Sequence, residues 1–556
     1  MTDDVIVGID LGTTNSLVAI VRDGAPLILP VEGQALLPSI VGVDEHGELI
    51  VGTTARNQYL AAPERTVRSI KRHMGEPGYQ VQLGDKDYTP EEISSIILRR
   101  LAEAASAELG QPVRRAVITI PAYFADRQRQ ATMRAGELAG LEVVRLLHEP
   151  TAAALVYGMG KAGVENAVVY DLGGGTFDVS VVELGGGMTE VRASHGNRQL
   201  GGDDFDELIV EAMLESVGRD VQVELRNDRI AMARLSRAAE SAKIHLSDHP
   251  FVGIREEFLG VHKGRPVHIE MELTRAEFVR RIEPLLNSTL DAVRRALRES
   301  GIDRRALDAV LLVGGSTRIP AVRDLVSEEL GLEPRQNIHP DQAVALGAAA
   351  QAGALAGLDV DAVLVDITPH SLGIRALGYW NGMRTSDLFS QLIRRNTPIP
   401  VSKSEFFYTS HEDQTEASIE VYQGEDPRAS RNTLLGEFML EGLPRGGGQE
   451  ILVSFDYDIN GILHVSAVDR STGKSKEIAV HTSALKEVEQ PAPSEFQVLL
   501  SRLQALDAGT VGPTVSKMLM DLLAEAPEVA AAKDPAQMES WQDRASEFLF
   551  EHGKEY

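Results

Sequence analysis

Two glycine turns in this sequence contain the residue types that bind phosphate. Each consists of a β-branched run, an aspartate, and then glycines with threonine: Asp10, Gly12, Thr13 and Thr14 in the first turn, and Asp171, Gly173, Gly174, Gly175 and Thr176 in the second. Glycine has no Cβ and tolerates positive φ, so main-chain N–H groups can approach an anion closely. Two such turns facing each other predict a clamp around the β- and γ-phosphates of a nucleotide.

The aspartates of these turns, Asp10 and Asp171, stand at the ends of predicted strands. Carboxylate oxygens suit Mg²⁺, here through bridging water, so the pair predicts a magnesium site beside the phosphates. For either turn alone, an ordinary turn between two strands explains the residues equally well. The matching positions of the two aspartates favour the phosphate interpretation.

A third glycine turn follows an apolar strand pattern at 309–313. It contains Gly314, Gly315, Ser316 and Arg318 and precedes a helix that begins near Pro320. Ligands of α/β sheets collect at the carboxyl ends of strands and at helix N-termini, which favours a nucleotide here. Taken alone the signal is weak, because two glycines after a strand are common.

Other charged residues have plain explanations when taken singly. Lys71 is typical of a solvated surface lysine, and Glu149 precedes a proline and indicates a turn. Glu240 and Lys243 fit an exposed i,i+3 ion pair. The 14 histidines lack metal-ligand spacing, so we assign them no metal.

The chain positions these residues on alternating strand and helix patterns up to about residue 355, as an α/β architecture requires. The predicted strands include 5–9, 116–120, 167–170 and 309–313, and the predicted helices are 90–109, 127–139, 205–217, 231–246 and 275–299. The similarity of the two aspartate turns predicts a duplicated domain with a cleft between its halves.

The predicted secondary structure changes after an apolar segment near 353–366, which is flanked by acidic residues. Short strands separated by turn residues follow, up to about 482, and Asn460-Gly461 is a hairpin signal because both residues tolerate positive φ. We expect a compact β-sandwich there. Helical patterns return after Pro493.

Composition limits the classes of function. A chain of 556 residues suggests three to four domains. The 55 basic and 82 acidic side chains give a net charge of −27, which disfavours nucleic acid and anionic membranes as partners. The absence of cysteine excludes disulfides and thiolate chemistry, and no signal-like start or long apolar run is present. We therefore expect a cytoplasmic protein without a membrane span.

These motifs, in this order, resemble the seventy-kilodalton heat-shock chaperones of the DnaK type. The match extends from residue 8 to about 480 and is carried by 8–16, 120–124, 148–154, 171–179, 200–206, 313–320, 366–369 and 371–373. The resemblance implies a duplicated, two-lobed α/β actin-like ATPase domain at 1–355, an interdomain linker at 356–366, an all-β peptide-binding sandwich at 367–482 and a truncated α-helical lid at 483–556.

The resemblance also implies roles for single residues. The residues expected to bind the phosphates are Gly12, Thr13, Thr14, Gly173, Gly174, Gly175, Thr176, Gly201 and Gly202. Asp10 and Asp171 are expected to surround a hydrated Mg²⁺ ion. Lys71 positions the attacking water, Glu149 and Asp171 support the metal shell, and Thr176 lies near the γ-phosphate. Adenosine contacts fall to Glu240, Lys243, Ser247, Gly314, Gly315, Ser316, Arg318 and Asp341. Interdomain coupling falls to Pro121, Arg129, Arg145, Val363, Leu364 and Asp366, and peptide binding to Phe407, Ser410 and Ala417.

The implied activity is slow, Mg²⁺-dependent ATP hydrolysis, with K⁺ as a further ion that the resemblance allows. ATP and ADP would switch the affinity for extended apolar segments of client polypeptides, with a J-domain co-chaperone as partner. The alternatives are a small-molecule kinase and an actin-like filament protein on the same ATPase fold. A sandwich joined by an apolar linker disfavours both, because neither needs one.

Several departures from the family pattern indicate a divergent member. The segment between Lys71 and Ala116 is short, which leaves exchange by a standard nucleotide exchange factor open. The loop at 373–393 is long and contains Tyr379 and Trp380. Phe407 is retained in the groove, whereas Ser410 and Ala417 differ. With the short tail, these departures resemble the HscC-type branch.

Overall fold

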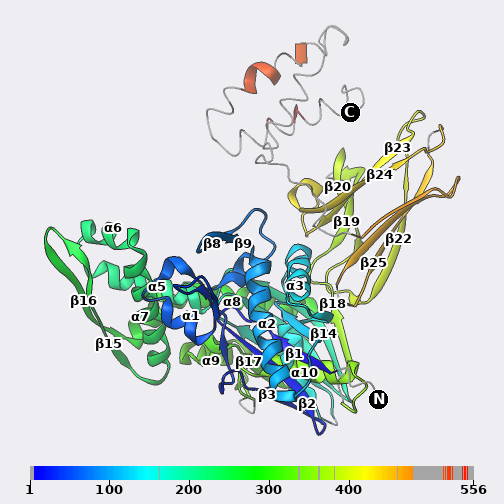
Figure 1. Cartoon of the computed structure of the whole chain (residues 1–556). Helices are drawn as coiled ribbons and strands as arrows, with labels where there is room; N and C mark the ends of the chain where they lie inside the picture. Colours follow the sequence, from blue (N-terminus) through cyan, green and yellow to red (C-terminus); the bar gives the residue numbers. More distant parts are fainter. Residues whose placement is uncertain are drawn as a thin grey trace. The chain divides into compact units, whose positions relative to one another are not determined.

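The computed structural model describes residues 5–479, except 162, 336–337, 361–362, 381, 447 and 460, and, beyond 479, residues 517, 518, 520, 522–526, 529, 537, 541, 544, 545 and 548. Figure 1 labels its elements. The chain divides into two compact units. The first comprises Met1–Leu372, Leu392–Ala417 and Leu440–Val480, and the second comprises Gly373–Gln391, Ser418–Met439 and His481–Tyr556.

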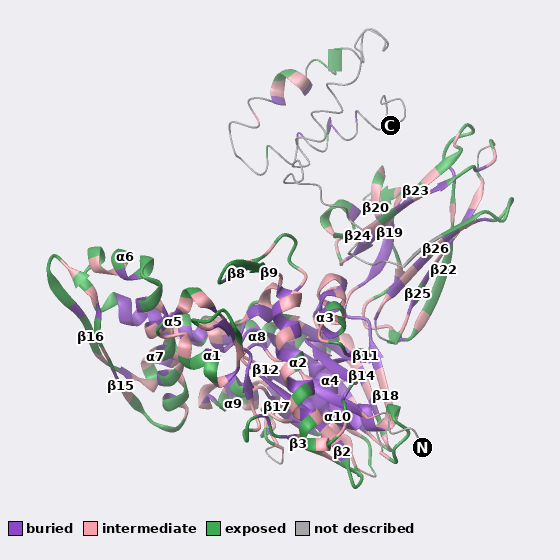
Figure 2. Ribbon diagram, viewed as in Figure 1, coloured by how far each residue is buried: buried purple, intermediate pink, exposed green. Residues whose placement is uncertain are grey.

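The N-terminal lobe of the first unit is built on a sheet of order β11-β10-β1-β2-β3, with β4 paired to β2. Its strands are β1 (Ile6–Asp10), β2 (Asn15–Arg22), β3 (Ala25–Leu29), β4 (Leu37–Pro38), β10 (Arg115–Ile120) and β11 (Glu142–His148). β1 is parallel to β10 and antiparallel to β2. The central strands are buried (Figure 2), so Asp10 ends a strand that is fixed by packing on its neighbours.

Helices cover this sheet where the apolar period of 3.6 predicts them. α2 (Pro90–Leu109) begins at a capping box, in which Thr89 and Glu92 exchange hydrogen bonds, and it ends before Gly110 at a positive φ of 67°. α3 (Asp126–Leu138) follows, and α10 (Ala343–Leu355) packs against β1. The predicted helices 90–109 and 127–139 are confirmed.

Smaller elements complete this lobe. A three-stranded sheet consists of β6 (Leu49–Val51), β5 (Val41–Val43) and β7 (Thr66–Val67), and α1 (Thr53–Gln58) lies beside it. A hairpin of β8 (Val81–Leu83) and β9 (Lys86–Tyr88) follows the 3₁₀ turn η2 (Ile70–His73). That turn carries Lys71.

The second lobe repeats the strand pattern of the first. Its sheet has the order β17-β12-β13-β14-β18-β21, with β12 (Glu165–Leu172), β13 (Phe177–Gly185), β14 (Met188–Asn197) and β17 (Ala309–Val313). β12 is antiparallel to β13 and parallel to β17. β1 has the same relation to β2 and β10, so the duplication predicted from the aspartate turns is visible in the topology.

The helices of this lobe are α4 (Glu149–Gly158), α5 (Gly202–Glu215), α6 (Arg219–Asn227), α7 (Arg229–Asp248), α8 (Arg275–Ser300) and α9 (Pro320–Leu330). Phe205, Leu235 and Phe278 lie in its core. The predicted helices 205–217, 231–246 and 275–299 are confirmed. The hairpin of β15 (Phe251–His262) and β16 (Arg265–Thr274) was not predicted, because a register shift between Glu256 and Gly260 interrupts the alternation on which a strand prediction depends.

The apolar segment near residue 360 adds a strand to the second lobe. β18 (Val363–Ile367) pairs in parallel with β14, with Leu364 opposite Thr189, and β21 (Pro398–Ile399) pairs antiparallel with β18. Val363 is 61% exposed, whereas Leu364 packs against the apolar core of this lobe. The earlier part of the predicted linker includes residues 361–362, which lie outside the described residues.

The predicted all-β region contains two four-stranded sheets. In the first unit, β22 (Val401–Tyr408), β25 (Glu450–Tyr457), β26 (Leu463–Asp469) and β27 (Ser475–Ala479) pair antiparallel in that order. In the second unit, the sheet order is β20 (Met383–Ile393), β19 (Leu372–Trp380), β23 (Glu416–Gln423) and β24 (Thr433–Glu441). Segment 373–393, predicted as a long loop, therefore consists largely of strands.

The predicted lid at 483–556 falls mostly outside the described residues. The residues described between 517 and 548 are helical. Trp541 is fully buried, and its Nε1 donates a hydrogen bond to the carbonyl of Leu522 at 3.0 Å. In the part of the chain described here, no helix combines the length and the apolar character that crossing a membrane requires.

Candidate functional site

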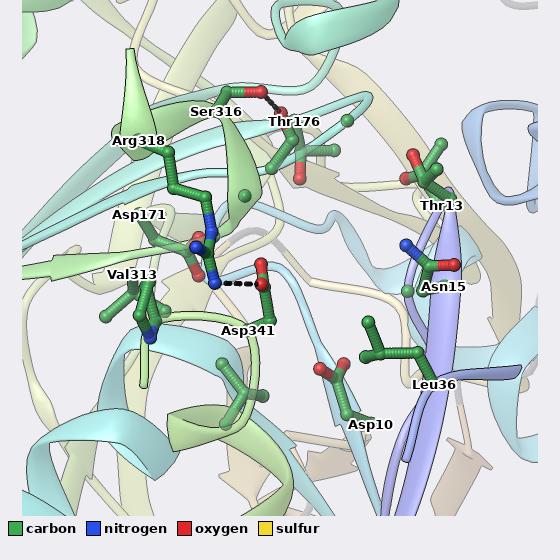
Figure 3. A pocket seen from close by; sticks show the side chains of 18 of the residues that line it. Asp10, Thr13, Asn15, Leu36, Asp171, Thr176, Val313, Ser316, Arg318 and Asp341 are labelled. Carbon is green, nitrogen blue, oxygen red and sulfur yellow. Dashed lines mark hydrogen bonds and ion pairs between the residues drawn. The ribbon is translucent and has the colours of Figure 1, made fainter. Parts of the chain in front are cut away.

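Residues of both lobes line a pocket of about 410 Å³. Figure 3 shows it from close by. Its lining includes these residues singled out from the sequence: Asp10, Gly12, Thr13, Thr14, Lys71, Glu149, Asp171, Gly173, Gly174, Thr176, Glu240, Lys243, Ser247, Gly314, Gly315, Ser316, Arg318 and Asp341. Residues that were not singled out, such as Asn15, Leu36, Ile244 and Val344, also line it.

The two glycine turns face each other across this pocket. A Cβ added at Gly174 would clash with Oγ1 of Thr14, and one added at Gly175 would lie 2.7 Å from Cγ2 of Thr13. The turns can approach only because these positions lack side chains. Glycines and threonines of both turns line the space between them.

A further glycine pair supports the second turn from behind. The N–H of Gly202 donates to the carbonyl of Gly173 at 2.9 Å, and the N–H of Asp203 donates to that of Gly174 at 2.7 Å. A Cβ at Gly201 would lie 2.5 Å from the carbonyl carbon of Gly174. Gly201 and Gly202 thus hold the main chain of the second turn in place.

A buried cluster of acids with one ammonium group lies at the base of the pocket. Lys71 forms an ion pair with Glu149, the first residue of α4, and the Lys71 side chain is only 5% exposed. The interpretation of Lys71 as a solvated surface lysine is therefore wrong. Its nearest charged partner comes from a segment 78 positions away, which sequence spacing does not show.

Two carboxyl groups of this cluster, those of Asp10 and Asp171, hold a proton more strongly than a carboxyl group in water does. Burial raises the pKa of Asp10 to about 7, with Glu149 adding to the shift and Lys71 opposing it. Burial also raises the pKa of Asp171, to which Glu149 and Asp10 add. Acids that repel one another in a buried site are stabilised in their charged forms by a bound cation.

This donor set fits a hydrated Mg²⁺ ion. Within the described residues, no three His, Cys, Asp or Glu side chains come close enough together to hold a metal by themselves. Mg²⁺ usually keeps several water ligands and is held by one or two carboxylates together with phosphate oxygens. Asp10 and Asp171 meet that requirement.

The third glycine turn forms the opposite part of the pocket. Gly314 has a φ of 82°, which suits glycine, and the 3₁₀ turn η4 (Gly315–Arg318) follows it. Oγ of Ser316 donates to the carbonyl of Gly173 at 2.8 Å, so this turn is attached to the second phosphate-type turn. Arg318 pairs with Asp341 at 2.8 Å (Figure 3).

Glu240 and Lys243 do not form the exposed pair that their spacing suggests. Nζ of Lys243 binds Oδ2 of Asp206 at 2.8 Å and the carbonyl of Gly202 at 3.0 Å, and Glu240 pairs with Arg56 at 3.5 Å. Both side chains instead line the pocket. The sequence spacing was therefore misleading at this helix face.

The whole chain can be compared with known families. It matches the family model HSP70, described as Hsp70 protein, over residues 6–82 and 76–547. The chain belongs to the Hsp70 family. Members of this family are chaperones and ATPases that bind ATP or ADP with Mg²⁺, and the pocket of this Hsp70 protein has the size and the donor groups that a nucleotide needs.

Three of the residues expected to couple domains meet in one buried cluster of this Hsp70 protein. Nη2 of Arg129 contacts Nε2 of His148, and Nδ1 of His148 lies 2.9 Å from Oδ1 of Asp366 on β18. Because a guanidinium group only donates, His148 accepts at Nε2 and donates from Nδ1. Burial opposes the charge on Asp366, but His148 and Arg145 hold the pKa of Asp366 below its ordinary value.

The remaining predicted coupling and peptide residues are more dispersed. Pro121 is buried before α3, and Leu364 lies on β18. Phe407 lies in β22 opposite Ile451, the N–H of Ser410 donates to Gln414 at 2.9 Å, and Ala417 lies in β23. The roles of Phe407, Ser410 and Ala417 stay predictions.

Sequence reasoning missed several side chains that surround the site of this Hsp70 protein. His148 precedes Glu149 in a segment used for the family match but was not assigned a role. Asp178 is buried, accepts a hydrogen bond from the N–H of Tyr123 at 3.1 Å, and has a pKa raised by burial. Asp206, the partner of Lys243, has a pKa raised by burial to about 7. A carboxylate in an otherwise apolar strand was the available signal for Asp178.

Proposed function

We propose that this protein is an ATP-dependent chaperone that binds extended apolar peptide segments, with an affinity switched by ATP binding and hydrolysis. The observation that carries the proposal is the pair of glycine turns facing each other over the buried Lys71–Glu149 ion pair. A γ-phosphate held between such turns is near both an ammonium group and the carboxylates suited to Mg²⁺. Family membership adds the peptide-binding half of the proposal.

In this mechanism the chain positions the nucleotide rather than attacking it. Gly12, Thr13, Thr14 and the turn at 173–176 donate hydrogen bonds to the phosphates, with the turn at 201–202 behind them. Asp10 and Asp171 would hold Mg²⁺, which neutralises phosphate charge when bound. Glu240, Lys243, Ser247, Gly314, Gly315, Ser316, Arg318 and Asp341 enclose the adenosine.

Lys71 orients the water that attacks the γ-phosphorus, and Glu149 fixes the ammonium group of Lys71. A lysine ammonium donates hydrogen bonds and is a poor base, and no histidine lies in the phosphate turns. Catalysis then depends on positioning and on electrostatic stabilisation of the charge on the leaving phosphate. We therefore propose a slow hydrolysis that times peptide binding.

The linker strand offers a route from peptide to nucleotide. Asp366 on β18 binds His148. Glu149, which follows His148 in the sequence, forms an ion pair with Lys71. Docking or release of β18 would therefore act on the group that positions the attacking water. Arg129 and Arg145 complete the cluster beside Asp366, and Pro121 precedes the helix that carries Arg129.

The finer assignments belong to the same proposal. Client polypeptides would contact Phe407, Ser410 and Ala417, and a J-domain protein would serve as co-chaperone in the cytoplasm. K⁺ is a further candidate ion, exchange by a standard factor stays open, and the short segment after Lys71 suggests the HscC-type branch.

ATP turnover by a Lys71→Ala variant tests this proposal. We expect a fall of at least about a hundredfold, because the variant removes a group that acts in the transition state, and an unfolded polypeptide should stimulate the unmodified protein. Lys263→Ala, at a lysine with a 75% exposed side chain, should match the unmodified protein. An ATPase that no unfolded polypeptide stimulates would contradict the chaperone and favour a kinase on this fold.

A further inference from the structure

Two histidines outside the nucleotide pocket lie where the segment after β18 meets the ATPase domain. The ring of His370 packs edge-on against that of Tyr123, with centroids 4.5 Å apart, and the Tyr123 ring lies 6.0 Å from that of His195 on β14. His195 is 3% exposed, and His370 is partly buried. Neither residue takes part in the mechanism above.

Three arginines lie near enough to His370 to oppose a positive charge on its ring. Arg198 belongs to the segment after β14, Arg129 to α3, and Arg395 to the turn before β21. The main chain of Tyr123 favours the charged form of the ring, but its effect is smaller than that of burial and of Arg198 and Arg129. A proton on His370 would therefore add a fourth positive charge to a partly buried group.

His195 has a mixed environment on the other side of Tyr123. Its Nε2 donates to Oε2 of Glu299 on α8 at 2.9 Å, while Arg295 and Arg395 face it as cations. Glu299 is shared, because it also binds Arg395 and accepts from Nδ2 of Asn396 at 3.0 Å. The carboxylate therefore compensates only part of the charge that a proton on His195 would add.

We propose that His370, with His195 as a weaker second group, makes the packing of β18 and of the turn at 394–397 on the ATPase domain sensitive to pH. Both rings are neutral while the segments are packed, and protonation drives the segments off. The inference rests on the proposed function, since it adds a pH input to the nucleotide-controlled docking of β18.

The direction of the effect follows from the histidine pKa values. Burial and the surrounding arginines lower the pKa of His370 to about 3, and burial also lowers the pKa of His195. In water a histidine has a pKa of about 6.5, so the packed form binds fewer protons than the released form. The packing of β18 and of the turn at 394–397 is therefore strongest above about pH 6.5, and it weakens as the pH falls below that value. One such histidine lowers the packing constant about tenfold between pH 7.5 and 5.5.

Asp366, the acid of β18 in this interface, does not titrate in this window in the same sense. The pKa of Asp366 is already depressed, so its stabilising charge persists down to more acidic pH. Asp10 and Asp206 have pKa values of about 7, but Asp10 lines the nucleotide pocket and Asp206 binds Lys243, which also lines it. Variants of the histidines, compared at equal pH, separate their effect from that of the pocket acids.

Hydrogen exchange of the β18 amides measures the packing directly. With saturating ATP and Mg²⁺, and after correction for the intrinsic pH dependence of exchange, the protection factor of β18 should fall about tenfold from pH 7.5 to 5.5. His370→Leu should leave a fall of less than about threefold, and His195→Asn with His370→Leu should abolish it. His46→Asn, at an exposed histidine, should behave as the unmodified protein does.

Each outcome separates this inference from the proposed function. Equal pH dependence in His370→Leu and in the unmodified protein, or a flat profile in the latter, overturns the inference. Failure of ATP to raise β18 protection at pH 7.5 contradicts the proposed function instead. Protection of β12 reports folding of each variant, and His370→Asn repeats the test if the leucine variant loses it.

Discussion

Gly174 in the pocket cannot be replaced by a larger residue without steric conflict. The space that a side chain at Gly174 would occupy already holds the hydroxyl of Thr14, which belongs to the opposite turn. The close approach of the two turns therefore requires that Gly174 has no Cβ. By contrast, Gly163 has nothing within 4 Å of the place where its Cβ would be.

Replacing Gly174 with alanine should separate the two turns. Because the neighbour is a short threonine rather than the end of a flexible chain, relief requires the turns to move apart, and we expect ATP affinity to fall about tenfold or more. Calorimetric titration with ATP in the presence of Mg²⁺ checks this. Gly163→Ala is the matched control and should bind as the unmodified protein does; equal affinity of both variants would contradict the clamp.

The side-chain partners at the site could be predicted from the sequence only in part. The glycine and aspartate positions are visible because their chemistry requires particular residue types at fixed spacing. Lys71 and Lys243 were open to plain interpretations because their partners, Glu149 and Asp206, come from other segments. Partner choice in a fold depends on tertiary packing, which the spacing of charges along one helix does not reveal.

At the scale of elements, neighbouring residues of the linker strand β18 differ in burial. Val363 is 61% exposed, while Leu364, the next residue, packs against the core of the second lobe. Successive residues of a strand point to opposite faces, so the apolar docking energy belongs mainly to Leu364.

Substitution of these two neighbours should therefore have unequal effects. Leu364→Asp places a carboxylate against apolar side chains and should weaken ATP-triggered peptide release by about tenfold or more. Val363→Asp should change it less than about threefold, because its side chain stays in solvent. Release of a fluorescent peptide after mixing with ATP measures both. Equal loss in the two variants would show that docking does not use the face seen here.

Element boundaries were predictable where local chemistry fixes them. α2 begins at the Thr89 capping box and ends at Gly110, and both signals lie in the sequence. The hairpin at 251–274 and the strands at 372–393 escaped prediction for different reasons. In the first, the alternation of buried residues is interrupted by a register shift. In the second, the expectation of a loop depends on the family resemblance and not on the segment's own pattern.

At the scale of the whole molecule, the proposed function requires one chain to connect a nucleotide pocket to a peptide-binding site. The matching aspartate turns allow a duplicated domain with a cleft to be predicted from the sequence, and the strand order of the two lobes agrees with that prediction. The family resemblance pointed to Arg129 and Asp366, but their contacts with His148 could not be inferred, because the three residues come from α3, β11 and β18. Coupling is a property of the assembled chain, so its test must use the full chain.

Reciprocity gives the most general test of the switch. If ATP lowers peptide affinity by some factor, peptide must lower ATP affinity by the same factor, and such factors typically lie at about 5 to 150. A Thr176→Ala variant, expected to slow hydrolysis, allows both equilibria to be measured by titration. We expect equal ratios in that variant, and both ratios should fall to about one when Leu364→Asp is added. Unequal ratios would mean that ATP and peptide act on different forms of the chain, and a ratio unchanged by Leu364→Asp would place the coupling outside β18.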